Sequence, residues 1–262
     1  MEAMTRWVRY ESAGGIGIGT LHGATVSVHA GSLFDSPVPN GASLEVEDLR
    51  LLAPCVPSKM VALWNNFGAL AAKLGKQPPA HPLYLIKPAT CIIGGGDAIE
   101  RPASYPGKIA YEGELGIVIG RRCKDVAADK AAEHIFGYTC VNDVTAADIL
   151  NETADFAQWC RSKSFDTFGA IGPAIATNID LSQARVVTRL AGVERQNYPL
   201  SDMLFSPAQL VSRISWDMSL LPGDVIACGT SVGVGSIRDG AEVEVYIEGI
   251  GSLSNSLRPP AP

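Results

Sequence analysis

Short hydrophobic runs separated by turn residues dominate the sequence, and they predict a protein built mainly of β-strands. Three early runs, divided by Gly-Gly and His-Gly turns, cover residues 5–10, 15–21 and 25–29. Later runs predict strands at residues 61–64, 83–87, 111–120, 138–144, 186–190, 224–228 and 242–247. Helical spacing is rarer, and the expected helices cover residues 65–74, 127–135, a segment from about 146, and 206–214. Residues 169–173 are typical of a turn. The pattern indicates a β-rich α+β fold.

The turn-rich pattern changes near Leu51-Leu52-Ala53-Pro54, where the early β-like runs end. We therefore predict a small N-terminal β module at residues 1–53 and a larger domain at residues 54–262. A chain of 262 residues is long enough to bury a substantial core in this arrangement.

Charge and composition narrow the function classes. A net charge of −6 argues against a nucleic-acid partner, which requires clustered lysine and arginine. No apolar run reaches the roughly 18 residues that a membrane span needs, and the start of the chain lacks a signal-peptide pattern. The six cysteines are scattered without a C-x-x-C pair, as is typical of reduced thiols. We therefore expect a cytoplasmic protein with neither a nucleic-acid nor a membrane partner.

A pair of glutamates in the strand predicted at residues 111–120 is the first candidate for chemistry. Glu112 and Glu114 share one face of a strand, about 6.6 Å apart along the chain. Two such carboxylates repel each other unless a cation lies between them, and Mg²⁺ prefers oxygen ligands. The alternative is a pair of solvated glutamates on an open sheet face. Asp143, at the end of a buried-looking strand, would supply a third oxygen ligand.

Two further segments could contact a ligand. Lys163 could present an ammonium group to an anionic substrate. The glycine-rich segment at residues 229–235 follows a predicted strand, and its glycines let the backbone approach a ligand closely. Each of these signals is weak when taken alone.

Taken together and in this order, the motifs resemble the fumarylacetoacetate hydrolase family. The resemblance covers roughly residues 5–256 and depends on five motifs. They are E-x-E at Glu112 and Glu114, N-D-V-T at residues 142–145, K-S-F-D-T-F at 163–168, P-G-D-V-I-x-x-G-T at 222–230, and E-G-x-G-x-L-x-N at 248–255.

The resemblance implies a mixed β-sandwich roll that forms a homodimer and holds Mg²⁺ or Mn²⁺ on Glu112, Glu114 and Asp143. It also implies a small carboxylic acid substrate with a 2-oxo or 2,4-dioxo group. Lys163 would then contact the substrate oxyanion, and Thr230 would bind its carboxylate. The other candidate substrate contacts are Asn66, Phe67, Lys87 and Gly229.

One departure from the family pattern bears on the reaction. Hydrolytic members, and some decarboxylating ones, carry a His and a Glu after an Asn-Tyr pair, and these positions fall here on Leu70 and Lys73. Neither residue can replace an imidazole–carboxylate pair that activates water. His81 lies further along the loop, and Ala147 replaces a common arginine. The segment is most similar to enzymes that decarboxylate 5-oxopent-3-ene-1,2,5-tricarboxylate or isomerise 2-hydroxyhepta-2,4-diene-1,7-dioate.

Three functions remain open at this point. The first is a metal-dependent lyase or isomerase of aromatic catabolism that works by decarboxylation or isomerisation through an enolate. The second is a C–C hydrolase of an acylpyruvate such as fumarylpyruvate. The third is a non-catalytic member that keeps the metal site and binds a ligand. Their products distinguish them, because decarboxylation releases CO₂ and hydrolysis releases two acids.

Overall fold

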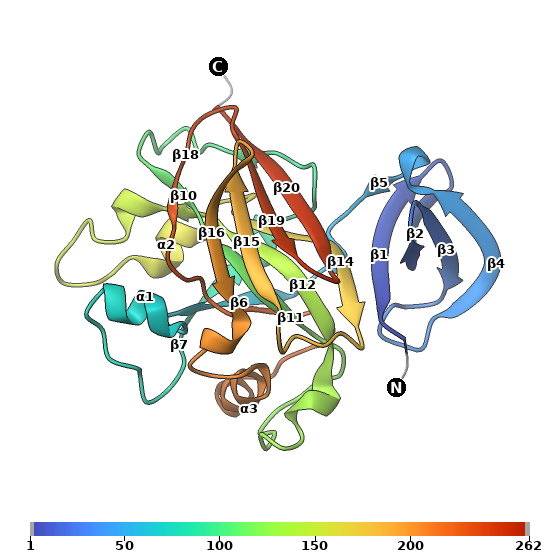
Figure 1. Ribbon diagram of the computed structural model, residues 1–262, viewed down its shortest axis with the longest axis horizontal. Coiled ribbons are helices and arrows are strands. Elements are labelled where there is room, and N and C mark those ends of the chain that lie inside the picture. Colours follow the sequence, from blue (N-terminus) through green and yellow to red (C-terminus); the bar gives the residue numbers. More distant parts are fainter. Residues whose placement is uncertain (1–2, 260–262) are drawn as a thin grey trace.

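The computed structural model describes residues 3–259, and most of its strands join one twelve-stranded sheet (Figure 1). Neighbours along the sheet are β4 (Val38–Glu45), β3 (Thr25–Ala30), β2 (Gly15–His22), β1 (Thr5–Ser12), β14 (Gly169–Thr177), β12 (Ile135–Asp143), β11 (Gly113–Ile119), β17 (Val225–Ala227), β6 (Lys59–Trp64) and β7 (Leu83–Pro88). Two short strands join the sheet from the side, β5 (Arg50–Leu51) beside β1 and β8 (Ile92–Ile93) beside β14.

Two smaller sheets complete the β-structure. The five-stranded sheet has the order β16 (Val193–Pro199), β15 (Arg185–Leu190), β19 (Glu242–Ile247), β20 (Gly251–Arg258), β9 (Ile99–Glu100). The three-stranded sheet has the order β13 (Thr145–Ala146), β10 (Ile109–Tyr111), β18 (Gly235–Ile237). The helices are α1 (Gly68–Lys73), α2 (Trp159–Lys163), α3 (Pro207–Asp217) and the 3₁₀ segments η1 (Val46–Asp48), η2 (Ala89–Cys91), η3 (Ala131–His134), η4 (Ala147–Ile149) and η5 (Leu200–Asp202).

The main core lies where the five-stranded sheet covers β11 and β12 (Figure 1). Successive side chains of a strand point to opposite faces, so Leu115 and Ile117 face this core, together with Val245. Val118 and Val141 face a second core on the other side of the large sheet. Strand β11 is therefore buried on both faces, and it provides a rigid base for the side chains at its end.

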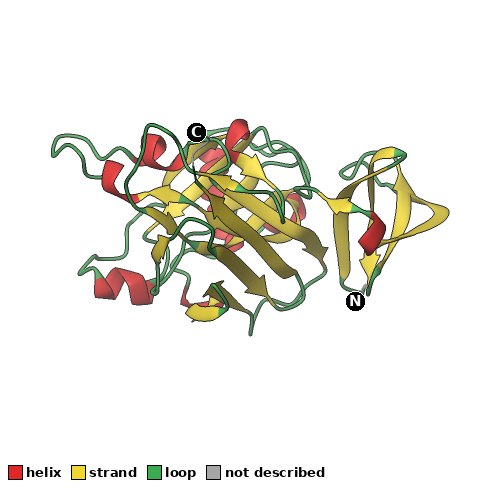
Figure 2. Ribbon diagram, turned by 90° about the horizontal axis from the view of Figure 1, so that it is seen from above, coloured by secondary structure: helices red, strands yellow, loops and turns green. Residues whose placement is uncertain are grey.

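The N-terminal strands β1–β4 lie to one side of this body (Figures 1 and 2). Their small core contains Val8, Tyr10 and Val26, and Ala174 of β14 closes it. Strand β1 pairs antiparallel with β14, so the module extends the large sheet of the body. The predicted module and domain bounds include residues 1–2 and 260–262, which lie outside the described residues.

The structure departs from the sequence predictions where glycine, proline or polar residues mask strand character. Residues 169–173, predicted as a turn, begin β14, a central strand that is buried along most of its length. The helix predicted from about residue 146 is instead β13 and η4, and the helix predicted at 127–135 is only η3. Strands β16 and β20 were not predicted, because polar residues interrupt their apolar positions. Tertiary pairing thus overrides local propensity.

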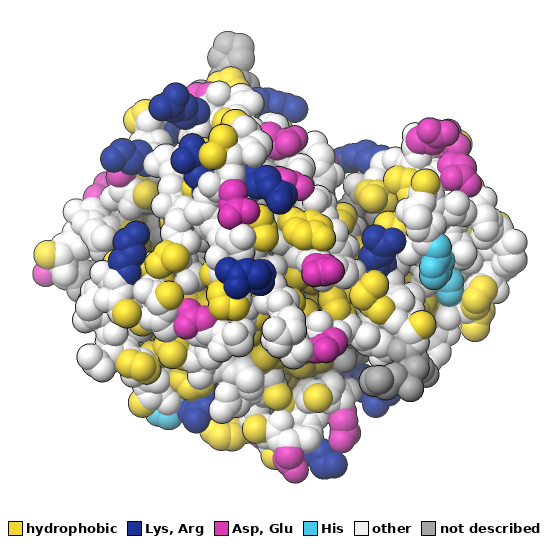
Figure 3. Space-filling view, viewed as in Figure 1, with side chains coloured by type: hydrophobic (Ala, Val, Ile, Leu, Met, Phe, Trp, Pro, Cys, Tyr) yellow, Lys and Arg dark blue, Asp and Glu magenta, His cyan; other side chains and the backbone are white. Residues whose placement is uncertain are grey.

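The surface of the described residues carries interspersed charges. On the face shown in Figure 3, lysine and arginine side chains alternate with acidic ones and leave no broad area of one sign. Between residues 3 and 259, no helix combines the length and the apolar character that crossing a membrane would require.

Candidate metal centre

Three carboxylates converge at one end of the paired strands β11 and β12. Glu114 lies in β11, Asp143 ends β12, and Glu112 lies in the break between β10 and β11. The Asp143 amide donates to the Glu112 carbonyl over 2.9 Å and fixes that break beside the strand end. One oxygen from each carboxylate lies within 4.8 Å of the other two. The predicted triad is therefore brought together, although Glu112 is not inside the strand predicted for it.

Asp143 is buried between two lysines. Lys87 Nζ donates to Asp143 Oδ1 and, over 2.9 Å, to the carbonyl of Phe168. Lys163 Nζ donates to Asp143 Oδ2 over 2.7 Å. Burial alone would raise the pKa of Asp143, but the two ammonium groups outweigh burial and lower that pKa below its ordinary value.

Glu114 is equally buried, but no lysine of residues 3–259 forms an ion pair with it. Its Oε2 accepts from the Gly229 amide over 2.7 Å, and its Oε1 has no hydrogen-bond partner among the described residues. Burial, and then the charges of Asp143 and Glu112, raise the pKa of Glu114 well above its ordinary value. A buried oxygen without a partner needs an explanation such as an ion.

Lys163 ends α2 and donates to three acceptors. These are Glu112 Oε2 at 3.0 Å, Asp143 Oδ2 at 2.7 Å and Thr145 Oγ1 at 2.7 Å. Burial would lower the pKa of Lys163, but the carboxylates, Asp143 first, raise it above its ordinary value. Lys163 is therefore an ammonium group that can hold a proton beside the triad.

The residues fit a hard divalent cation. Three carboxylates outnumber the two ammonium groups beside them, so this buried space carries a net negative charge once Glu114 is ionised, and Oε1 of Glu114, unpartnered among residues 3–259, can act as a ligand. Carboxylate oxygens are the ligands that Mg²⁺ and Mn²⁺ prefer. The Glu112 side chain is 17% exposed, so the site reaches solvent on that side.

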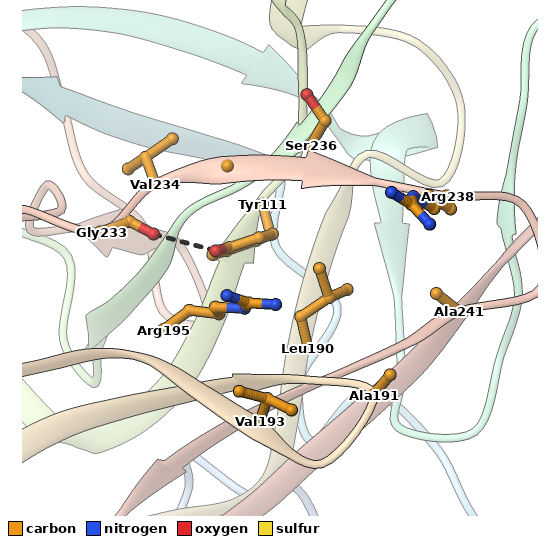
Figure 4. A pocket seen from close by; sticks show the side chains of 11 residues that line it. Tyr111, Leu190, Ala191, Val193, Arg195, Gly233, Val234, Ser236, Arg238 and Ala241 are labelled. Atoms are coloured by element: carbon orange, nitrogen blue, oxygen red, sulfur yellow. Dashed lines mark hydrogen bonds between the residues drawn. The ribbon is translucent and has the colours of Figure 1, made fainter.

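The glycine-rich loop at residues 229–235 lies beside β11, which carries Glu114 and is called the ligand strand below. Gly229 has φ of +89°, and a side chain there would lie 3.3 Å from Asn66 Cβ. Thr230 Oγ1 donates to the Gly113 carbonyl over 3.0 Å, and the Tyr111 hydroxyl donates to the Gly233 carbonyl over 2.9 Å (Figure 4). The loop is thus joined to the ligand strand at several points.

A cavity of about 640 Å³ lies behind this loop (Figure 4). Its walls include Tyr111, Leu190, Arg195 and Arg238, and none of the three carboxylates lines it. The cavity is therefore separate from the candidate metal centre.

The remaining predicted contacts are buried. Asn66 is 1% exposed, its Nδ2 donates to the Cys228 carbonyl, and its Oδ1 accepts from the Phe205 amide. Phe67 packs edge-on against Tyr198. Lys87 is fully buried against Asp143. Substrate contact by Asn66, Phe67 and Lys87 stays a prediction, and so does the role of Thr230.

The segment with the family departure forms α1. Leu70 is half-buried and Lys73 is exposed, while the Ala69 amide donates to Asp202 over 2.9 Å. His81 lies against Arg213 of α3, with 3.2 Å between Nδ1 and the guanidinium nitrogen.

Two residues at the site carried no role in the sequence analysis. Thr145 donates to Glu112 Oε1 over 3.0 Å and lies within the quoted N-D-V-T motif, so its position was available as a signal. Gln196 lies in the unpredicted strand β16, and no motif pointed to it.

Comparison with known proteins defines the class first. Residues 59–258 match the family model described as fumarylacetoacetate (FAA) hydrolase C-terminal, so the chain belongs to the fumarylacetoacetate hydrolase family. Residues 5–54 match a second model, described as Rv2993c-like, N-terminal. The β-rich fold and the family predicted from the motifs are thereby confirmed.

Three relatives with named activities indicate which members of the family this chain resembles. The crystal structure of 2-hydroxyhepta-2,4-diene-1,7-dioate isomerase from Mycobacterium marinum is 38% identical, with 98% of this chain and all of that chain covered and a TM-score of 0.90. The 5-carboxymethyl-2-hydroxymuconate delta-isomerase of Mycobacterium smegmatis is 40% identical, with 97% and 99% covered and a TM-score of 0.89. Oxaloacetate tautomerase YisK of Bacillus subtilis is 33% identical over 226 residues, which are 81% of this chain and 74% of that protein. The predicted isomerase branch agrees with these names.

Proposed function

We propose that this protein is a divalent-metal-dependent isomerase or tautomerase of a small 2-oxo or 2,4-dioxo carboxylic acid. The observation that carries the proposal is the buried Oε1 of Glu114, which has no partner within the described part of the chain and belongs to a cluster of three carboxylates. Mg²⁺ or Mn²⁺ held by Glu112, Glu114 and Asp143 would suit that cluster. The names of the relatives favour a proton shift as the reaction.

A cation bound there would supply a Lewis acid for the developing charge on a keto or enolate oxygen. Lys163 would keep its ammonium charge at Nζ, next to Glu112 and Asp143, and that charge would stabilise the oxyanion of the enolate. Keto–enol interconversion removes one proton from carbon and adds one to oxygen, so no water is consumed, and solvent can carry the proton between the two atoms. Thr145 accepts from Lys163 and would keep Nζ oriented.

The absence of a water-activating pair supports isomerisation over hydrolysis. Leu70 and Lys73 of α1 stand where hydrolytic relatives carry His and Glu, and His81 instead contacts Arg213. Lys163 has its three donors engaged by Glu112, Asp143 and Thr145, and these contacts keep it protonated, so it is not a ready base for water.

The test compares three reactions on one enzyme preparation. The enol form of oxaloacetate would be followed by its ultraviolet absorbance, CO₂ by a coupled assay, and fumarylpyruvate cleavage by product acids. We expect keto–enol conversion that a chelator abolishes and added Mg²⁺ or Mn²⁺ restores, with little CO₂ and no cleavage. Glu114→Gln should lose this activity at least about 1,000-fold.

A matched control uses Asp224, which is buried and paired with Lys59 outside the triad. Asp224→Asn should lower stability and keep the cation requirement. Cleavage of fumarylpyruvate to two acids would favour the hydrolase. Release of CO₂ would favour the decarboxylase. A protein that binds the cation and shows none of the three activities would favour the non-catalytic alternative. Turnover in the presence of excess chelator would overturn the metal dependence.

A further inference from the structure

Gln196 is a buried amide side chain for which the proposed reaction has no use. It lies in β16 and is 1% exposed. Its Oε1 accepts from the Gly113 amide over 3.0 Å, and its Nε2 donates to Thr230 Oγ1 over 2.8 Å and to the Ser231 carbonyl over 3.2 Å. A backbone amide can only donate and a carbonyl can only accept, so these partners fix which end of the Gln196 amide faces which.

On one side, this amide holds the backbone between two of the carboxylates. Gly113 is the residue between Glu112 and Glu114, so the position of its nitrogen affects where both side chains begin. The space around it is tight, because a side chain at Gly113 would come within 2.0 Å of Thr188 Oγ1. The Gly113 carbonyl also accepts from the Tyr198 hydroxyl over 2.6 Å. Strand β16 therefore supports the ligand strand directly.

On the other side, Gln196 holds the glycine-rich loop. Thr230 Oγ1 accepts from Gln196 and donates to the Gly113 carbonyl, so the three residues form a closed set of hydrogen bonds. Next to Thr230, the Gly229 amide donates to Glu114 Oε2. The same side-chain amide thus reaches both the backbone between Glu112 and Glu114 and the loop that orients the Glu114 carboxylate.

We propose that Gln196 is a positioning residue for the metal centre. Its side chain joins the ligand strand to the Gly229–Thr230 loop, so that the Glu114 oxygen without a partner among the described residues faces the other carboxylates. This inference rests on the proposed function insofar as it assigns the triad a cation. Partners behind metal ligands orient them, and their removal weakens metal affinity about 10- to 100-fold.

The experiment measures the Mn²⁺ dissociation constant by calorimetry in wild type and in Gln196→Met, which keeps the size and loses the amide. We expect affinity to fall about 10- to 100-fold. The matched control is Asn255→Leu, because Asn255 is a 2% exposed amide whose Nδ2 donates to the carbonyls of Gly94 and Asp97, both at 2.8 Å, away from the triad. That control should lower the melting temperature and bind Mn²⁺ as wild type does.

A double-mutant cycle tests the route through Thr230. Gln196 acts partly through the Thr230 hydroxyl. The double variant Gln196→Met/Thr230→Val should therefore lose less Mn²⁺ affinity than the product of the fold-losses in the two single variants. Multiplicative effects would overturn coupling through Thr230. If Gln196→Met does not fold, Gln196→Asn takes its place, since the shorter side chain cannot reach both Gly113 and Thr230.

The outcomes separate this inference from the proposed function. Wild-type Mn²⁺ affinity in a folded Gln196 variant would overturn the inference and leave the proposed function standing. A wild-type protein that binds neither Mn²⁺ nor Mg²⁺ would overturn both, because Gln196 would then have no metal ligands to position.

Discussion

Two carboxylates at the ends of neighbouring strands, Asp143 and Glu114, are both fully buried and have opposite surroundings. Asp143 accepts from the ammonium groups of Lys87 and Lys163, and its pKa is lowered despite burial. Among the described residues, Glu114 accepts only from the Gly229 amide, and burial and neighbouring carboxylates raise its pKa. The two groups therefore divide the site into a charge-balanced half and a half that lacks a cation.

This difference indicates which half supports folding and which supports function. A buried charge is tolerated when opposite charges and hydrogen bonds surround it, as they do at Asp143. A buried carboxylate without a cationic partner costs stability, and such perturbed groups cluster at functional sites. We therefore expect changes at Asp143 and at Glu114 to shift the stability of the metal-free protein in opposite directions.

Replacing Asp143 should have the largest effect on stability. Asp143→Asn leaves the ammonium groups of Lys87 and Lys163 buried without their shared counter-charge, which should lower the free energy of unfolding by about 3–5 kcal/mol. Urea denaturation in chelator measures this loss. Asp224→Asn, at the other buried aspartate–lysine pair, should also destabilise but leave Mn²⁺ affinity unchanged. An undiminished stability in Asp143→Asn would contradict the charge-balanced half.

Removing Lys87 tests the same half from the other partner. Lys87→Met should lower the free energy of unfolding by about 2–3 kcal/mol, less than Asp143→Asn, because Lys163 still pairs with Asp143. Since Lys87 is fully buried, the KM of the substrate should stay near the wild-type value. A large rise in KM with unchanged stability would instead support the predicted substrate contact.

Glu114→Gln should act in the opposite direction and by less. The neutral side chain keeps an acceptor for the Gly229 amide and removes a carboxyl group whose charged form is disfavoured by burial and by two neighbouring carboxylates, so the metal-free protein should gain about 1–2 kcal/mol in its free energy of unfolding at a pH well above the ordinary pKa of glutamate. The same substitution should remove the stabilisation that Mn²⁺ confers on wild type. Denaturation with chelator and with Mn²⁺ gives both values. A destabilised metal-free Glu114→Gln would contradict the comparison.

The sequence sufficed to predict the triad because its signals are local. Glu112 and Glu114 are two residues apart, and Asp143 ends a hydrophobic run, so strand geometry alone brings such groups to a common edge. The structure reaches that result with Glu112 in a break between two strands, which alternation did not predict. Family motifs added the metal and the roles of Lys163 and Thr230.

The rest of the site depends on contacts between distant residues. Lys87 meets Asp143 from 56 positions away, and Gln196 meets Gly113 from 83 positions away. Gln196 lies in a strand whose polar residues gave no periodic signal, and β14 was hidden by its glycines and proline. Such contacts are decided by the packing of whole sheets, which a pattern within one segment does not contain.

The smallest expected effect is the pH dependence of Mn²⁺ affinity, which depends on the proton that Glu114 carries. Because its pKa is raised in the folded, metal-free protein, Glu114 keeps a proton at pH values where an exposed glutamate would have lost it. Below that raised pKa, a cation must displace the proton, so Mn²⁺ affinity should fall as pH falls, by up to about tenfold per pH unit. Above it, affinity should level off. The lowered pKa of Asp143 places its own protonation at the acid end of this range.

Calorimetry in two buffers of different ionisation enthalpy, repeated from acid to alkaline pH, measures the protons released per cation bound. Release should be larger below the raised pKa of Glu114 than above it, and the same group gives a stability effect of matching sign. The pKa of Glu114 is raised in the folded, metal-free protein, so protonated Glu114 contributes to stability. This contribution is complete below the ordinary pKa of glutamate, and it is lost as the pH rises through the folded pKa. Mn²⁺ affinity that does not vary with pH, with no proton release, would show that Glu114 is already ionised without a cation. The difference in charge balance between the surroundings of Asp143 and those of Glu114, which their hydrogen bonds indicate, would then be contradicted.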